Sequence, residues 1–281
     1  MKYWIQIFSL SQLEKLNLDK YDYIYWGTET CIFKKSFDNE KIGKDYLKKY
    51  NKLLNWKKLV YVSWFLPKFI EEKYFKFLEE LIEVYQDNLE ITINDWWIYN
   101  FLKKKKYLWK IKINIWTNLY YHVKDPYASV IKPEKFIQIS IDRQFYNNFF
   151  KKLGFNWNLE FYYPKHWIDF KYICFPKTLY FPYVQYSFTR ACPWSLEKAW
   201  EKVSKLVLDC GWCDRKYYSQ QVKQKLKWKD LLVESIYVPN AQYYDVSKYI
   251  DLKDIKKNLD IDVITDNSLL VKEKRTYDFS E

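Results

Sequence analysis

The 281-residue sequence has very little glycine, histidine or methionine: it contains 4 Gly, 2 His and 1 Met. An average chain of this length would contain roughly 20 Gly, at about 7% usage. No apolar run approaches the roughly 18 to 20 residues that cross a bilayer. The first eight residues are too short and too alternating for a secretory signal. We therefore expect a cytoplasmic protein without a membrane span.

Aromatic residues and positive charge are abundant in the same sequence. Hydrophobic residues make up 49% and aromatic residues 22%, which excludes a disordered chain. The length of 281 residues fits one large domain or two ordinary ones. Lys and Arg number 47 against 35 Asp and Glu, for a net charge of +12. This excess is compatible with a nucleic-acid partner. The alternative is that an AT-rich genome favours Lys codons without any functional demand.

The sequence contains 14 Trp, several of them at places where a chain normally uses glycine. Turns and helix caps favour glycine because they often need a positive φ. One interpretation is a bacterial gene that reads the UGA codon as glycine and is translated here with the standard table. The alternative is a truly Trp-rich protein. Recoding predicts turn or cap positions, often exposed and some with positive φ, at Trp56, Trp64, Trp116, Trp157 and Trp212.

Short strand-like runs recur along the chain, with helical stretches between most of them. The clearest helical stripe covers residues 70–85, where apolar residues repeat at the spacing of one buried helix face. Strand and helix alternating every 20 to 35 residues predict a parallel α/β sheet, and about eight units favour closure into a single barrel. A doubly wound sheet would usually show a Gly-rich first turn, which is absent. The expected strands are residues 2–8, 21–25, 59–63, 89–94, 111–115, 136–141, 159–163, 235–238 and 261–265.

Polar residues follow several of these expected strands. In a parallel barrel the chemistry lies at the carboxyl ends of the strands, so these positions are candidates for a functional site. The alternative is that loops are polar in any protein. Cys31 is singled out because it follows a strand and a tight turn at residues 26–27. The positions are residues 28–31, Ser63, residues 94–95, residues 117–118 and residues 142–143.

The other four cysteines lie late in the chain. Cys192, Cys210 and Cys213 fall within 22 residues, and thiolates so placed are typical ligands of zinc or of an iron–sulfur cluster, which need a fourth. A thioredoxin-type motif is excluded because the Cys pair follows a helical run instead of opening one. Cys174 lies in an apolar segment and is compatible with an ordinary buried thiol. The residues alone leave zinc and iron–sulfur open.

Residues 25–35, YWGTETCIFKK, resemble the strand-end segment of the peptidase U-thirty-two family, in which Tyr-Leu-Gly precedes an acidic residue and a basic stretch. A cysteine in that segment is typical of the UbiV-like branch, whose members are iron–sulfur proteins of oxygen-independent ubiquinone hydroxylation. The branch pattern continues with a later Arg-Cys and a closely spaced Cys pair, which map to Cys192, Cys210 and Cys213. Fainter matches lie at residues 60–63, 94–95, 114–120 and 235–238.

The resemblance has two departures. The Cys pair is spaced by two residues where the branch has three, and Ala191 separates Arg190 from Cys192. Cys174 is also a candidate for the fourth ligand in place of Cys31, which would give the all-late set Cys174, Cys192, Cys210 and Cys213. The resemblance implies one barrel-like domain over residues 1–281, with a cysteine-bearing insertion at about 174–230.

The resemblance also implies a [4Fe–4S] cluster on Cys31, Cys192, Cys210 and Cys213. It implies work as a hydroxylase subunit beside a second, UbiU-like family member. Other relatives hydroxylate RNA bases, and the family name suggests proteolysis, although no nucleophile and base motif supports a peptidase. A further alternative is a zinc-stabilised RNA-binding barrel. No catalytic residue is assigned.

Overall fold

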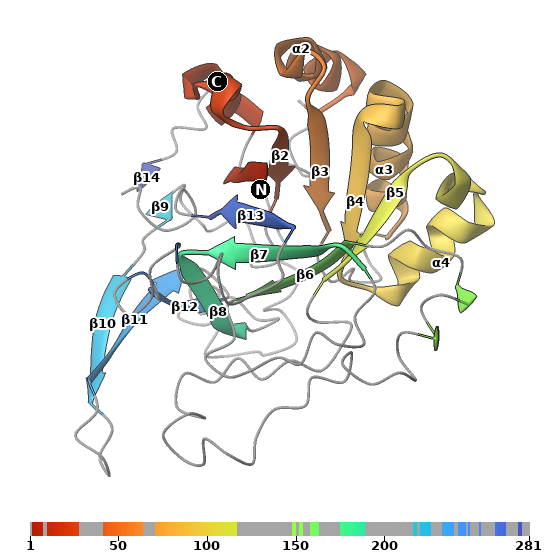
Figure 1. The fold of residues 1–281 in the computed structure, drawn as a ribbon. Helices are drawn as coiled ribbons and strands as arrows, with labels where there is room; N and C mark the ends of the chain where they lie inside the picture. Colours follow the sequence, from red (N-terminus) through yellow and green to blue (C-terminus); the bar gives the residue numbers. More distant parts are fainter. Residues whose placement is uncertain are drawn as a thin grey trace, which may run out of the picture.

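A computed structural model describes the architecture of the chain (Figure 1). Its described residues are 2–7, 10–27, 42–63, 71–116, 148–149, 152–153, 158–162, 175–188, 216–217, 220–225, 232–238, 241–245, 247, 253, 262–267 and 275–276.

Eight parallel strands close into a barrel, which confirms the predicted fold class. Every neighbouring pair is parallel, and β13 closes the circle by pairing with both β1 and β7. Asp262 helps to fix this closure, because its carboxylate accepts a hydrogen bond from the backbone N–H of Lys177 at 2.7 Å. The strands are β1 (Lys2–Ile7), β2 (Tyr23–Trp26), β3 (Lys58–Val62), β4 (Leu89–Ile93), β5 (Lys112–Ile115), β6 (Asn158–Tyr162), β7 (Lys177–Phe181) and β13 (Val263–Asp266).

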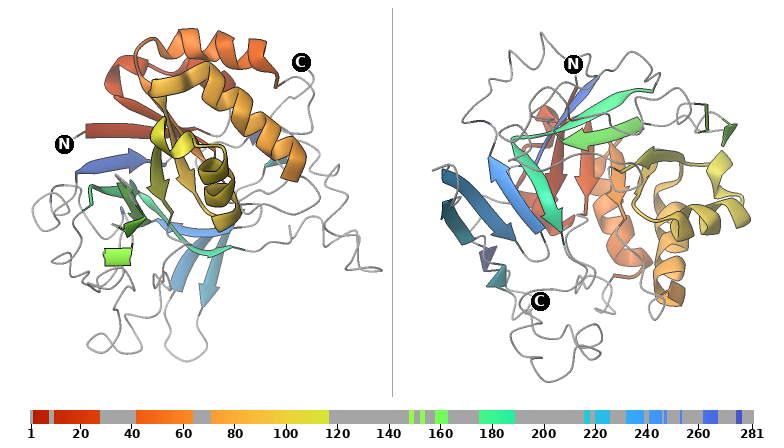
Figure 2. Two further views of the ribbon diagram at one scale, coloured as in Figure 1. Left: turned by 90° about the vertical axis from the view of Figure 1, so that its right-hand side faces the viewer. Right: turned by 90° about the horizontal axis from the view of Figure 1, so that it is seen from below.

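Helices cover the outer face of the barrel beside β2 to β5 (Figures 1 and 2). The predicted stripe is confirmed in α3 (Glu71–Tyr85), which buries six residues from Tyr74 to Tyr85. They pack in one core with outward side chains of the strands, such as Ile91 and Tyr61. The other outer elements are η1 (Leu10–Lys15), η2 (Leu18–Lys20), α2 (Lys44–Leu54), η4 (Gln86–Asn88), α4 (Trp96–Lys104) and η5 (Tyr107–Trp109). No described helix is long and apolar enough to cross a membrane.

The barrel interior is unusually polar. Parallel barrels are normally filled with branched apolar side chains. Along β4, however, Leu89, Ile91 and Ile93 join the outer core, whereas Glu90 and Thr92 alternate with them and are also buried. The same alternation leaves polar residues inside β5, β6 and β7. The hydrophobic core therefore lies between barrel and helices, and hydrogen bonds organise the lumen.

A second sheet is inserted between the last two barrel strands. Its order is β10-β11-β12-β8, all antiparallel, and it lies beside the β7 and β13 side of the barrel (Figure 1). Residues 235–238 are indeed a strand, but they belong to this sheet and not to the parallel repeat. The elements are β8 (Tyr183–Phe188), β10 (Gln220–Lys225), β11 (Leu232–Val238) and β12 (Ala241–Asp245), and β9 (Lys216–Tyr217) pairs with β14 (Arg275–Thr276).

β7 was not among the expected strands, and residues 136–141 lie outside the described residues. The other seven barrel strands coincide with expected runs to within a few residues. The expected division into one domain with an insertion at about 174–230 remains a prediction.

Candidate functional site

The strand register sorts the inward side chains into layers of four from alternate strands, as in other parallel barrels. One layer contains Tyr25, Thr92, Glu160 and Thr265, from β2, β4, β6 and β13. The next layer toward the carboxyl ends contains Gln6, Val62, Trp116 and Tyr180, from β1, β3, β5 and β7. Ring contacts agree with this order, because the Trp116 and Tyr180 rings meet edge to face at 4.8 Å.

Glu160 lies in the centre of the upper barrel and is fully buried. Its Oε1 accepts hydrogen bonds from the Tyr25 hydroxyl at 2.8 Å and from Thr92 Oγ1 at 2.7 Å, and its Oε2 accepts one from the Tyr180 hydroxyl at 2.8 Å. Burial raises the pKa of Glu160 from its ordinary 4.5 to about 8; the three hydroxyls oppose the rise and the charge of Glu90 adds to it. A carboxyl of this kind is neutral at pH 7 and can donate a proton.

Glu90 occupies a different environment nearer the amino ends of the strands. Lys112 Nζ lies 3.4 Å and Lys58 Nζ 4.0 Å from its Oε1, and Asn114 Nδ2 donates to its Oε2 at 3.1 Å. Burial and the neighbouring Glu90 carboxylate raise the pKa of Tyr23 to about 12. One barrel thus contains a carboxyl beside two ammonium groups and another surrounded by hydroxyl groups.

The predicted strand-end residues that the structure describes use their side chains to form hydrogen bonds with backbone groups. Ser63 and Asn94 are fully buried and lie together: the Asn94 N–H donates to Ser63 Oγ at 3.0 Å, and Asn94 Nδ2 donates to the Ser63 carbonyl. Asp95 caps α4 by accepting from the Trp97 N–H at 2.9 Å. These side chains hold the ends of β3 and β4 in place. The other strand-end candidates, at residues 28–31, 117–118 and 142–143, lie outside the described residues.

Gly27 lets two strand ends approach closely. Its φ is +114°, and an added Cβ would lie 2.7 Å from the carbonyl oxygen of Val62. Its own carbonyl accepts from Gln6 Nε2 at 3.0 Å. No L side chain fits this position without strain.

We expect Gly27→Ala to lower the free energy of unfolding by about 2 to 4 kcal/mol, because left-handed strain adds to a backbone clash. Gly43→Ala is the matched control, since a Cβ there meets nothing within 4 Å. Gly43 precedes α2 with an ordinary φ of −104°, so alanine should cost less than about 1 kcal/mol. Urea unfolding of both variants measures the difference, and equal losses would contradict the close approach.

The structure does not test the predicted metal ligands. All five cysteines, Cys31, Cys174, Cys192, Cys210 and Cys213, lie outside them. Within the described ranges, no three His, Cys, Asp or Glu side chains come together as a metal site. What the structure does provide is the position of the flanking elements. β2 ends at Trp26, five residues before Cys31, and β8 ends at Phe188, four residues before Cys192.

Two of the five tryptophans expected to stand for glycine are described, and they differ. Trp116 is fully buried against Tyr180, as a genuine tryptophan would be. Trp56 is 67% exposed in a turn, but the positive φ of that turn, 53°, belongs to the preceding Asn55. Trp64, Trp157 and Trp212 lie outside the described residues, so recoding stays a hypothesis.

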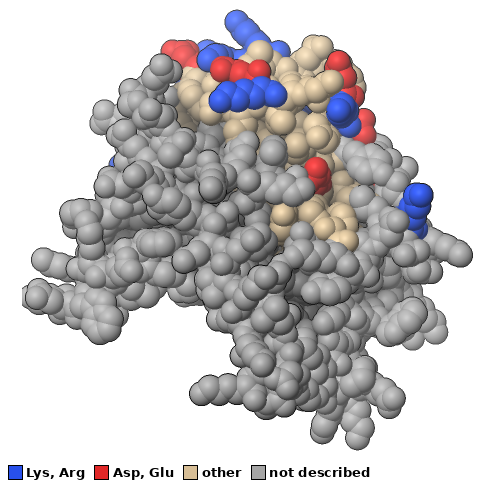
Figure 3. All heavy atoms as spheres, turned by 90° about the vertical axis from the view of Figure 1, so that its left-hand side faces the viewer, with Lys and Arg blue, Asp and Glu red and all other residues tan. Residues whose placement is uncertain are grey.

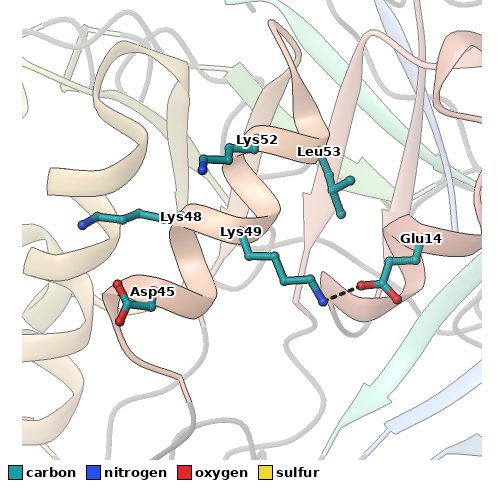
Figure 4. A pocket seen from close by; sticks show the side chains of 6 residues that line it. All are labelled: Glu14, Asp45, Lys48, Lys49, Lys52 and Leu53. Atoms are coloured by element: carbon teal, nitrogen blue, oxygen red, sulfur yellow. Dashed lines mark ion pairs between the residues drawn. The ribbon is translucent and has the colours of Figure 1, made fainter.

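Lysines of the outer helices pair with carboxylates, as Lys44 does with Glu83 and Lys105 with Glu79. On the face drawn in Figure 3, the described Lys and Arg side chains are interspersed with Asp and Glu. Residues 103–106 are exposed at the end of α4, as expected if lysine is simply abundant. An open hollow lies along α2 (Figure 4), where Lys49 Nζ pairs with Glu14 Oε1 at 2.8 Å. Its lining is Glu14, Asp45, Lys48, Lys49, Lys52 and Leu53. This mixture of acidic and basic side chains does not by itself indicate an RNA-binding surface. RNA stays an alternative partner.

Sequence reasoning missed the hydrogen-bonded lumen altogether. Glu160, Tyr25 and Thr92 lie within runs that were correctly predicted as strands. The usable signal was the alternation itself: among the buried residues 89–94 every second position is polar (Glu90, Thr92 and Asn94), and Asn158 and Glu160 repeat the pattern in β6. Polar residues at such positions indicate an interior that hydrogen bonds must satisfy.

The fold and this interior define the class of the protein: a closed, all-parallel α/β barrel with a polar lumen. No family model, curated protein or solved structure matches the chain.

Proposed function

We propose that the protein carries a [4Fe–4S] cluster on Cys31, Cys192, Cys210 and Cys213. We further propose that it acts in oxygen-independent hydroxylation as a UbiV-like member of the peptidase U-thirty-two family, beside a UbiU-like partner. The observation that carries the proposal is the spacing of these cysteines: one thiol just beyond an early strand and three within 22 residues late in the chain. Four thiolates around one pocket are the usual ligands of such a cluster.

The barrel topology supports this ligand set. The segment containing Cys31 leaves the carboxyl end of β2, next to Gly27. The chain also leaves the carboxyl end of β7 at Phe181 and enters β8 at Tyr183, and Cys192 follows β8. The Cys31 segment therefore leaves directly from the edge of the barrel where parallel barrels place their chemistry, and the chain reaches Cys192 from the same edge by way of β8.

Cysteine variants purified without oxygen test the proposal. We expect about four irons and four sulfides per chain, with a broad visible absorption band. Cys31→Ser should lose most of the iron because a three-thiolate site binds the cluster weakly, whereas Cys174→Ser is the matched control and should keep it.

Loss of iron in Cys174→Ser with retention in Cys31→Ser would overturn the ligand assignment. A single zinc without iron would instead favour the alternative of a zinc-stabilised RNA-binding barrel. Hydroxylation of an RNA base, rather than a quinone precursor, would leave the cluster in place but change the substrate.

A further inference from the structure

Inside the barrel, several buried polar atoms have no hydrogen-bond partner among the described residues. Each belongs to an inward-facing residue that is at most 3% exposed. A buried polar atom left without a partner costs about 1 to 3 kcal/mol, so native proteins satisfy such atoms, often with ordered water. The atoms are Trp4 Nε1, Gln6 Oε1, Asn114 Oδ1, Asn158 Oδ1 and Thr265 Oγ1.

These atoms follow the barrel axis. By the strand register, Asn158 lies nearest the amino ends, and Trp4 and Asn114 lie one layer higher. Thr265 shares the layer of Glu160, and Gln6 lies in the layer above it. Gln6 in turn donates to the carbonyl of Gly27 at the end of β2. The set therefore leads from the lower barrel, past Glu160, to the carboxyl ends of the strands.

Glu160 stands in the middle of this column with hydroxyl groups around it. The titratable groups facing it in the described barrel are Tyr25 from β2, Glu90 from β4 and Tyr180 from β7. Burial and the Glu160 carboxyl raise the pKa of Tyr25 well above its ordinary value, so this phenol stays protonated. Lys58 and Lys112 lie against Glu90.

We propose that the barrel lumen is a proton path, in which water bound by Gln6 and Thr265 connects the carboxyl of Glu160 to the strand ends. In the forward direction the O–H proton of Glu160 passes to a bound water, and that water releases another proton at the strand ends. The carboxylate is later reprotonated along the same path. No electron moves and no covalent bond other than O–H breaks.

Such a path supplies a proton to a molecule held at the carboxyl ends of the strands. The ligand that the path binds is water. The path serves a reaction that consumes a proton at the carboxyl ends of the strands. Nothing in the path requires an iron–sulfur cluster, so it stands or fails independently of the proposed function.

Infrared spectroscopy of the whole protein after a rapid pH jump tests this path. The carbonyl stretching band that disappears in Glu160→Gln identifies the protonated Glu160 carboxyl. In the unchanged protein, a jump from pH 6 to pH 9 should abolish this band within the mixing time. Thr265→Val removes the water-binding hydroxyl at nearly constant volume, and we expect it to slow the loss at least tenfold.

Thr265→Ser keeps the hydroxyl and is the matched control, expected to behave as the unchanged protein does. If Thr265→Val does not fold, Gln6→Met repeats the test in the layer between Glu160 and the strand ends, because it removes the other water-binding acceptor. A loss equally fast in the hydroxyl-free and hydroxyl-retaining variants overturns the path. A high-resolution crystal structure with no water at Gln6 and Thr265 overturns it as well.

Discussion

Replacing Trp116 with alanine is expected to lower the free energy of unfolding by about 3 to 5 kcal/mol, as for other fully buried aromatic side chains. The indole is wholly inaccessible to solvent and packs edge to face against Tyr180, one layer above Glu160. Its removal leaves a cavity inside a closed barrel, where the strands cannot move together to fill it. Equilibrium unfolding in urea, followed by far-ultraviolet circular dichroism, measures the loss.

Trp109→Ala is the control for this prediction. Trp109 is 90% exposed in η5, so its replacement should change stability by no more than about 0.5 kcal/mol. A loss below 1 kcal/mol for Trp116→Ala would contradict the packing seen here. It would also restore residue 116 as a candidate for a misread glycine, which mass spectrometry of the protein from its own source decides directly.

The stability of the protein is expected to fall as pH rises from 4.5 to 8. An unfolded chain loses the Glu160 proton near the ordinary pKa of 4.5, whereas the folded barrel keeps it until about pH 8. Across this window the folded state binds more protons than the unfolded state, so each step toward higher pH favours unfolding. The full difference is on the order of 5 kcal/mol, at 1.36 kcal/mol for each pKa unit.

Glu160→Gln should flatten this dependence, because an amide keeps the hydrogen-bonding groups but does not ionise. The control is Glu14→Gln on the outer surface. Hydrogen bonds from Lys49 and Tyr50 lower the pKa of the Glu14 carboxyl, so its removal leaves the fall above pH 4.5 in place. Urea unfolding at pH 5, 6.5 and 8 measures all three proteins. An equal slope in Glu160→Gln would show that another group is responsible.

The barrel could be predicted from the sequence because its outer side follows the usual pattern of apolar strand residues packed against amphipathic helices. Strand alternation and the helical stripe of α3 are local signals, and both predict elements that the structure contains. β7 escaped notice because Pro176 and Pro182 flank its five residues, and prolines of this kind resemble loop boundaries. The partner of β11 could not be predicted either, since alternation reveals a strand but not the strand it pairs with.

The candidate site was less predictable than the fold. Cysteine spacing is visible in a sequence, whereas the cluster around Glu160 joins residues 20 to 135 positions apart. In the sequence nothing distinguishes Tyr25, Thr92 and Tyr180 from other strand residues. Only the closed barrel brings their hydroxyl groups to the carboxyl of Glu160. Ser63 and Asn94 were singled out correctly as strand-end residues, but local sequence could not reveal that their polar groups are used to bind backbone.

The place of β13 affects how the chain can fold during synthesis. This strand separates β1 from β7, so β1 is synthesised well before residues 263–266, which are needed to close the sheet. Until then β1 and β7 are edge strands with unpaired backbone N–H and C=O groups, and such edges readily pair with strands of other chains. The antiparallel sheet of β8 and β10 to β12 is completed in the same interval, because its strands precede β13. The sheet therefore stays open from the synthesis of β1 until β13 emerges, and chaperone demand should peak just before that point.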